Sequence, residues 1–323
     1  MTIKETEKHL KGLLKNAETT LIEYSSSFDH NDNFVKDVKK FNIAESFLLE
    51  IKTKSLTVLD SIRNLLNEKT GELFFKELRL FLLQNYGPFV DLLKMLFLQI
   101  AFYLKNKNMI NLMETDNSLA FNLLGGNYLL LTTNYKSLRT DLNQFFFKDI
   151  TLKDELVVDD KTQLWNVGNM HHKLFPSDFY QIRDFAFSLT APARGKISND
   201  DMIILEEQVS ELIKNAIKHG NKNDINKIVK TWTLFTGEMY KIIVEDEGQG
   251  FQNLEKWNDF NRKRNAAILN KDIDAIMKYV SYDSAREDDS NGGNALFSAL
   301  EFWDSGLIYS AKKNKVLAVK YFF

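Results

Sequence analysis

Cysteine is absent from this 323-residue chain, and proline occurs only 3 times. Without cysteine the protein has no disulfide framework and no thiolate metal site, and we expect it to work in a reducing compartment. The scarcity of proline, together with 25 phenylalanines, favours a helix-rich and well-packed protein.

A large excess of charge of one sign is also lacking, since the net charge is −2 at pH 7. We therefore expect no nucleic-acid partner. The N-terminal segment MTIKETEKHLKGLLKNAETT mixes charges of both signs and does not resemble a signal peptide. The most apolar window, Pro88–Leu104, contains Asp91 and Lys94 and is shorter than a membrane span. We expect a buried helix there, no membrane association and a cytoplasmic protein.

The two halves of the chain differ in their hydrophobic pattern. Residues 1–150 have apolar residues at helical spacing and no chemical motif, which predicts a helical regulatory or docking domain with a break at Gly87–Pro88. Residues 151–323 mix helical and strand patterns, so the predicted fold class is α+β. The predicted strands are Gln163–Phe175, Lys227–Phe235, Met239–Glu245, Leu307–Ala311 and Val316–Phe323.

One helical stretch, Glu207–Asn221, places polar side chains at intervals of four residues. Glu207, Glu211, Asn215 and His219 share one face. An asparagine oxygen can coordinate Mg²⁺, and a carboxylate one turn away can orient or deprotonate a nucleophile. The pattern indicates a pocket for a metal-bound phosphate, and a solvent-exposed helix face is the alternative interpretation. A separate apolar face suited to packing on a sheet contains Leu205, Val209, Leu212, Ala216 and Ile217.

A strand that ends in an acidic, glycine-rich turn follows, with the sequence IIVEDEGQGF over residues 242–251. Asp246, at the strand end, can accept a hydrogen bond from an exocyclic amine such as that of adenine. Gly248 and Gly250 allow the backbone to approach a flat ligand closely. Turns with an acidic residue and glycines are common, so this turn alone is weak evidence for a ligand site. It becomes informative in combination with the polar helix face that precedes it.

Together the two stretches resemble the GHKL ATPase superfamily, the adenine-nucleotide fold of gyrase, MutL and histidine kinases. The pattern E-x-x-x-N-A-x-x-H is similar to its N box, and D-x-G-x-G-F is similar to its first glycine box. The resemblance implies a Bergerat-type α/β sandwich, with a mixed sheet covered by helices on one face, that binds ATP and Mg²⁺.

Residues 164–323, roughly, further resemble the serine-kinase anti-sigma factors of bacterial sporulation and stress response. The similar segments are FPSDFYQIR, NAIKHGN and the GG-x-x-L-F start of the last helix. Such proteins phosphorylate a serine of an anti-anti-sigma (STAS) protein, and some sequester a sigma factor. The resemblance implies a cytoplasmic bacterial signalling protein with these partners, and it leaves open whether the chain forms a homodimer.

The resemblance also implies roles for individual residues. Glu211 would be the catalytic carboxylate, Asn215 the Mg²⁺ ligand and Asp246 the residue that recognises adenine. Four glycines would contact the nucleotide: Gly248 and Gly250 beneath the adenine, and Gly292 and Gly293 at the phosphates. The last pair opens a predicted helix, where free backbone N–H groups favour an anion.

Two positions depart from the family pattern. Ala295 stands in the second glycine box where a glycine is expected, and it would be strained if the position required a positive φ. Leu317 is expected near the adenine, where the family often has a threonine. The polar stretch 252–291 corresponds to the family's ATP lid, and one or two solvated helices would give the same composition.

Three functional hypotheses follow. The first is an ATP-dependent protein serine kinase of the anti-sigma type. The second is a non-catalytic module in which ATP orders a docking surface for another protein. The third, a relic of a histidine kinase, is the weakest, because neither His9 nor His30 is followed by the acidic residue of a phosphoacceptor motif.

Overall fold

The computed structural model describes residues 2–29, 36, 38–106, 125–148, 157–279, 282 and 294–322. A helical N-terminal region precedes a six-stranded mixed sheet with helices, so the predicted α+β class is confirmed. The chain divides into two compact units, Met1–Phe145 and Phe146–Phe323.

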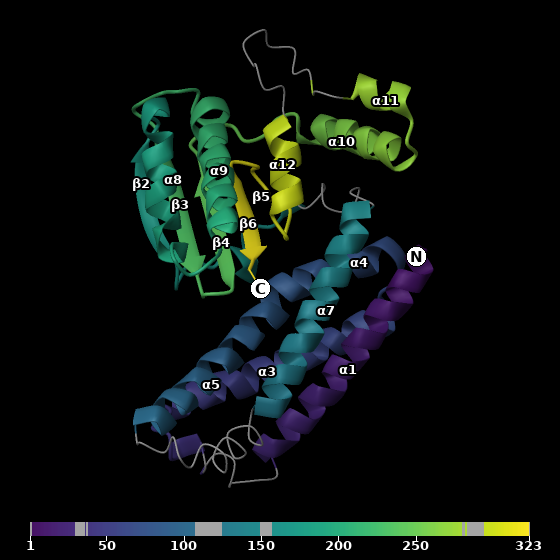
Figure 1. Ribbon diagram of the computed structural model, residues 1–323, viewed down its shortest axis with the longest axis vertical. Coiled ribbons are helices and arrows are strands. Elements are labelled where there is room, and N and C mark those ends of the chain that lie inside the picture. Colours follow the sequence, from purple (N-terminus) through teal and green to yellow (C-terminus); the bar gives the residue numbers. More distant parts are fainter. Residues whose placement is uncertain are drawn as a thin grey trace. The chain divides into compact units, whose positions relative to one another are not determined.

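Long helices form the first unit (Figure 1). Aromatic residues join them, because Phe75 stacks on Phe145 with ring centroids 4.3 Å apart, and the Tyr86 hydroxyl donates to the Leu131 carbonyl at 3.3 Å. Phe75 and Tyr86 are fully buried, as expected for the core of a helical bundle. The helical elements are α1 (Ile3–Asp29), α3 (Glu45–Glu68), α4 (Gly71–Phe81), the π-helical turn η1 (Leu82–Tyr86), α5 (Gly87–Asn106) and α7 (Gly126–Lys148).

The predicted break at Gly87–Pro88 was wrong, since α4, η1 and α5 follow one another without a gap. Pro88 has no N–H to donate to the carbonyl of Gln84, four residues earlier. That carbonyl instead accepts a hydrogen bond from Lys54 Nζ of α3 at 3.4 Å. A neighbouring helix thus satisfies the group that the proline leaves unpaired, next to a π-helical turn of the kind that accommodates such irregularities.

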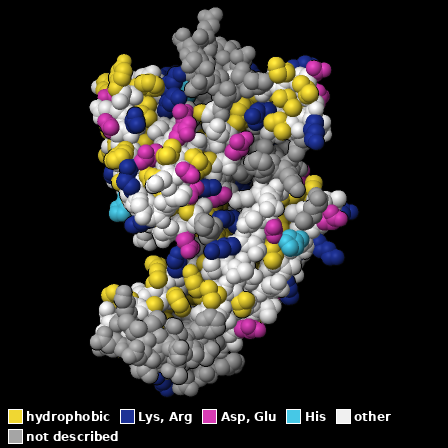
Figure 2. Space-filling view, in the orientation of Figure 1, with side chains coloured by type: hydrophobic (Ala, Val, Ile, Leu, Met, Phe, Trp, Pro, Cys, Tyr) yellow, Lys and Arg dark blue, Asp and Glu magenta, His cyan; other side chains and the backbone are white. Residues whose placement is uncertain are grey.

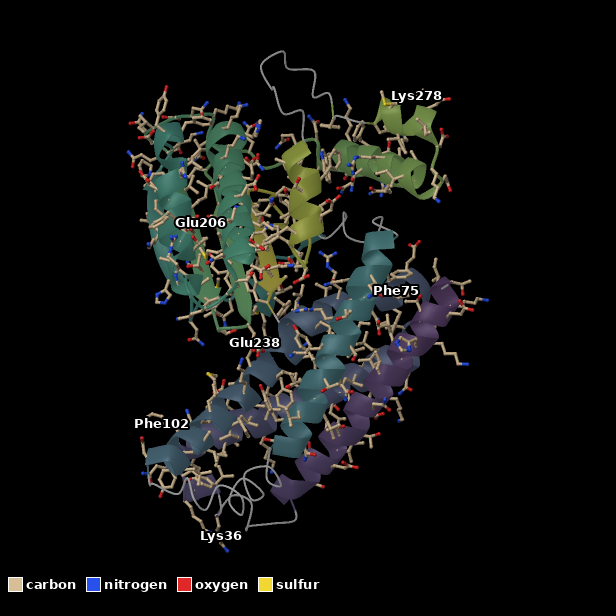
Figure 3. The ribbon with its side chains drawn as sticks, viewed as in Figure 1. Lys36, Phe75, Phe102, Glu206, Glu238 and Lys278 are labelled. Carbon is tan, nitrogen blue, oxygen red and sulfur yellow. The ribbon has the colours of Figure 1, made fainter. Side chains whose placement is uncertain are left out.

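The combined helix Gly71–Leu104 is long and apolar enough to cross a membrane, judged by length and composition only. Core helices of soluble proteins pass the same test, and 39% of the most apolar window is buried. Phe102, near the end of α5 (Figure 3), is 66% exposed. The prediction of a buried helix without membrane association therefore stays a prediction.

The second unit is built on one sheet with the strand order β1-β5-β6-β4-β3-β2. The β1–β5 pair is parallel and all other pairs are antiparallel. The strands are β1 (Val157–Val158), β2 (His171–Pro176), β3 (Ile228–Phe235), β4 (Met239–Glu245), β5 (Ile308–Ser310) and β6 (Lys315–Tyr321). Successive predicted strands pair as antiparallel neighbours, β3 with β4 and β5 with β6.

Three helices cover one face of this sheet: α8 (Ile182–Thr190), α9 (Asn199–Asn215) and α12 (Asn294–Phe302) (Figure 1). Side chains alternate along β4, so Tyr240, Ile242 and Val244 point to these helices and join one buried cluster. The predicted apolar face of α9 belongs to the same cluster. Two further helices, α10 (Leu254–Leu269) and α11 (Ile273–Lys278), lie in the stretch predicted to resemble an ATP lid.

The predicted strand Gln163–Phe175 is shorter than expected. Its first part forms the 3₁₀ turn η5 (Gln163–Trp165), and only β2 is extended. The Leu164 carbonyl of η5 accepts a hydrogen bond from Lys241 Nζ at 2.9 Å. Lys241 points to the face of the sheet opposite the helices, and burial lowers the pKa of its ammonium group to about 8.

Candidate functional site

The central helix α9 begins with an N-cap at Ser198, whose side chain accepts the Asp201 N–H at 3.1 Å. It continues into the π-helical turn η8 (Ala216–Gly220). Leu205, Val209 and Leu212 bury one face against the sheet, which fixes how the helix is rotated about its axis. The polar face predicted from the sequence is thereby turned away from the core.

A cavity of about 580 Å³ opens beside this helix, within the usual size range of small-molecule sites. It brings together four of the predicted site residues: Glu211, Asn215, Asp246 and Gly250. His219 also lines it, whereas Glu207 and Gly248 do not. Gly292 and Gly293 lie outside the described residues. Aromatic and aliphatic walls are supplied by Phe179, Val244, Phe251, Trp257, Leu296, Tyr309 and Val316.

Lysines outnumber carboxylates among the described residues that line this cavity. Among the described residues its acidic lining consists of Glu211 and Asp246, and its lysines are Lys214, Lys218, Lys222, Lys313 and Lys315. Lys315 is paired with Glu245 at 2.9 Å, and Lys214 is paired with Glu211 at 3.1 Å. Figure 2 shows charges of both signs scattered over the face in view. Such a lining suits a polyanionic ligand.

The Asp246 carboxylate lies just beyond β4. Its backbone is held by Asn314 of the β5–β6 turn, because Asp246 N donates to the Asn314 carbonyl at 3.0 Å and Asn314 Nδ2 donates to the Asp246 carbonyl at 2.9 Å. Burial raises the pKa of Asp246 to about 6, although the hydrogen bond from the Gly248 N–H at 2.8 Å opposes the shift. At neutral pH the group is therefore a partly buried hydrogen-bond acceptor.

The glycines around Asp246 are required by the chain's own packing. A Cβ at Gly220 would lie 2.3 Å from Asp246 Cγ, and one at Gly248 would lie 2.3 Å from the Gly220 carbonyl oxygen. Gly250 has a φ of 79°, and a Cβ there would lie 2.1 Å from the Lys312 carbonyl oxygen. The sequence interpretation assigned the glycines of this turn to ligand contact, whereas close backbone packing already accounts for them.

Asn221 is a structural residue that sequence reasoning missed. It is fully buried, and its Nδ2 donates to Ser177 Oγ at 2.8 Å and to the Ile228 carbonyl at 3.2 Å. Its Oδ1 accepts the Glu247 N–H at 2.7 Å. One carboxamide thus ties the end of the central helix to the start of β3 and to the acidic turn. Asn221 is the second asparagine of the segment NAIKHGN, and its place in that segment could have indicated its importance.

The expectation that Leu317 lies near the adenine was wrong. Leu317 pairs with Ile243 and is buried on the opposite face of the sheet, whereas the preceding residue, Val316, lines the cavity. Val316 pairs with Tyr309, which also lines the cavity. Burial and the charge of Asp246 both raise the pKa of Tyr309, so its hydroxyl stays neutral near that carboxylate.

Ala295 lines the cavity in the first turn of α12 and does not have a positive φ. The strain considered at this position is therefore absent, and alanine fits the backbone as it stands.

A magnesium ion fits this site only together with a ligand that supplies further oxygens. Among the described residues no group of three or more His, Cys, Asp and Glu side chains could hold a metal ion. Asn215 offers one neutral oxygen, and Glu211 lies one helical turn away. Mg²⁺ commonly keeps several waters and binds few protein oxygens plus substrate phosphates, which this donor set permits.

No protein-family model matches the chain, and a search of curated proteins gives no match to it. The resemblance to the GHKL superfamily therefore depends on the sequence motifs alone.

Proposed function

We propose that the protein is an ATP-dependent protein serine kinase of the anti-sigma-factor type, acting on a STAS-type anti-anti-sigma protein. The observation that carries the proposal is the lysine-lined cavity that holds Glu211, Asn215 and Asp246 together. These residues come from two separate motifs of the sequence, and their convergence on one cavity supports a common ligand. A cytoplasmic location and a sigma factor as a second partner belong to the same proposal.

Each of the three residues has a distinct role. Asp246 accepts a hydrogen bond from the exocyclic amine of adenine, at the end of the cavity that Tyr309 and Val316 line. Asn215 contributes an oxygen to Mg²⁺, and bound Mg²⁺ neutralises phosphate charge. Glu211 accepts the proton of the attacking serine hydroxyl. The lysines bind the phosphate groups through charge-assisted hydrogen bonds.

A binding switch without phosphoryl transfer is the second candidate, and one observation favours it. Ile273 and Met277 lie one turn apart on α11 and are 73% and 70% exposed. Figure 2 shows hydrophobic side chains gathered at this end of the second unit. An apolar surface on the segment that corresponds to the ATP lid suits a docking site whose position depends on the nucleotide.

Two variants separate these candidates. In a kinase, Glu211→Ala retains ATP binding and loses phosphoryl transfer by about 10²–10⁴-fold, whereas Asn215→Ala weakens both together. In a binding switch, Asn215→Ala abolishes partner docking and Glu211→Ala leaves it intact. The experiment measures ATP affinity, transfer of labelled γ-phosphate to STAS proteins and partner binding for each variant. Wild-type protein that binds ATP and its partner without transferring phosphate rules out the kinase.

A further inference from the structure

An ion pair lies inside the candidate nucleotide cavity. Lys214 Nζ is 3.1 Å from Oε1 and 3.3 Å from Oε2 of Glu211, so the ammonium contacts both carboxylate oxygens. Both residues line the cavity, and their side chains are 26% and 23% exposed. Lys214 immediately precedes Asn215, so one helical turn carries a carboxylate, an ammonium and a carboxamide.

This arrangement conflicts with the role proposed for Glu211. A carboxylate that already accepts two hydrogen bonds from an ammonium is a poorer acceptor for the proton of an incoming hydroxyl. The ammonium must therefore leave Glu211 before that carboxylate can act as a base. The lysine side chain has a flexible four-carbon stem and three donors, so it can exchange one oxygen partner for another without movement of the helix.

We propose that Lys214 binds the terminal phosphate of ATP and, by moving there from Glu211, frees that carboxylate for catalysis. The inference rests on the proposed function and assigns one of its cavity lysines to a particular phosphate. The terminal phosphate carries more negative charge than one carboxylate and offers three oxygens, so it competes for the ammonium. ADP and AMP lack this phosphate and leave the Lys214–Glu211 pair closed.

With Glu211 free, the phosphoryl group passes from ATP to the serine hydroxyl. The serine oxygen forms a bond to the γ-phosphorus while the bond from that phosphorus to the β–γ bridging oxygen breaks. The proton of the serine hydroxyl passes to Glu211. ADP leaves with the electron pair of the broken bond, and the phosphate-bound ammonium of Lys214 offsets charge on the transferred group.

The test is Lys214→Met, which removes the ammonium and keeps an apolar stem. Calorimetric titrations of the full chain with the magnesium complexes of ATP, ADP and AMP give three affinities. We expect the ATP affinity to fall roughly tenfold or more, as for loss of a charge-assisted hydrogen bond, and the AMP affinity to stay within about twofold. Lys214→Arg keeps a cation and should retain the preference for ATP over AMP.

Lys230→Met is the matched control. Lys230 is also paired with a glutamate, since its Nζ lies 3.6 Å from Glu245 Oε1, but it does not line the cavity. Its replacement should leave all three affinities unchanged. Lys214→Gln, which keeps a polar end, is the variant to titrate if thermal unfolding shows that Lys214→Met is not folded.

The failure of this inference differs from the failure of the proposed function. If the wild-type chain binds ATP more tightly than AMP and the Lys214 variants keep the same ratio, Lys214 does not contact the terminal phosphate, and the nucleotide site stands. If the wild-type chain binds none of the three nucleotides, both the proposed function and this inference are wrong. A fall in ATP affinity without a matching fall in AMP affinity supports both.

Discussion

Gly220 and Asp246 lie so close together that a Cβ on Gly220 would be 2.3 Å from Asp246 Cγ and 2.5 Å from its Oδ2. Gly220 ends the helical segment that carries Glu211 and Asn215, and Asp246 follows β4. The two motifs are thus in direct contact, and the position of the carboxylate depends on the absence of a side chain at residue 220.

Gly220→Ala should therefore displace the Asp246 carboxylate and disturb its hydrogen bond from Gly248. We expect ATP affinity to fall roughly tenfold, by the loss of one hydrogen bond to a charged group. Calorimetry measures this directly. Gly12→Ala is the control, because Gly12 lies in helix α1 and a Cβ there meets nothing within 4 Å; its ATP affinity should not change.

Asp246 should lower the stability of the ligand-free protein at neutral pH. Its pKa is about 6 in the folded chain against an ordinary value of 3.8. Between these values the folded state binds more protons than the unfolded state, so the free energy of unfolding falls as pH rises from about 4 to 6. Asp246→Asn should remove this fall and raise stability at pH 7 by about 1–2 kcal/mol, a value reduced for partial exposure.

Chemical denaturation at pH 4.5 and pH 7 compares the two proteins. Equal pH dependence in wild type and Asp246→Asn would show that the carboxylate is not destabilised by burial. Asp259→Asn is the control, since Asp259 is an exposed residue of α10 outside the cavity lining.

Lys241 predicts a second pH effect, of opposite direction. Burial lowers the pKa of its ammonium group from 10.5 to about 8. Between these values the unfolded state binds more protons, so stability rises with pH over this window. Between pH 8 and pH 10, the rise in unfolding free energy should be about 2 kcal/mol smaller in Lys241→Met than in wild type. The variant Lys230→Met, at a more exposed lysine, should keep the wild-type slope.

The second unit should fold alone and retain the nucleotide site. The described part of the cavity lining lies entirely within Phe146–Phe323. A fragment of residues 150–323 keeps β1, which pairs with β5, and should bind ATP with wild-type affinity. A fragment that begins at Lys161 loses β1 and should unfold at a lower temperature. If the longer fragment is insoluble, the two units depend on each other for stability.

The sequence predicted the fold class because local patterns decide it. Alternating apolar residues located β3 and β4, and every residue of the predicted apolar helix face is buried in the core cluster, which also contains Met202 and Ile213. The break at Pro88 was wrong because Lys54, distant in sequence, accommodates the proline. Leu317 was placed near the ligand because a one-residue error in a strand reverses the direction of the side chain.

The candidate site was predictable only in part. Motif spacing located Glu211, Asn215 and Asp246, which share the cavity. The position of Tyr309 in the cavity lining depends on the pairing of β5 with β6. The hydrogen bonds of the Asn221 side chain join segments that are distant in sequence. Such relations arise from tertiary contacts, which the spacing of the motifs did not predict.

Binding of Mg²⁺–ATP to the full chain, measured by calorimetry at pH 7.5 beside Mg²⁺–GTP, tests the central claim most directly. We predict saturable binding of ATP to one site, weaker binding of GTP, and a roughly ten- to hundredfold loss of ATP affinity in Asp246→Asn with no loss in Asp259→Asn. Failure of the wild-type chain to bind ATP, or equal ATP affinity in Asp246→Asn, would contradict the assignment of this cavity as an adenine-nucleotide site.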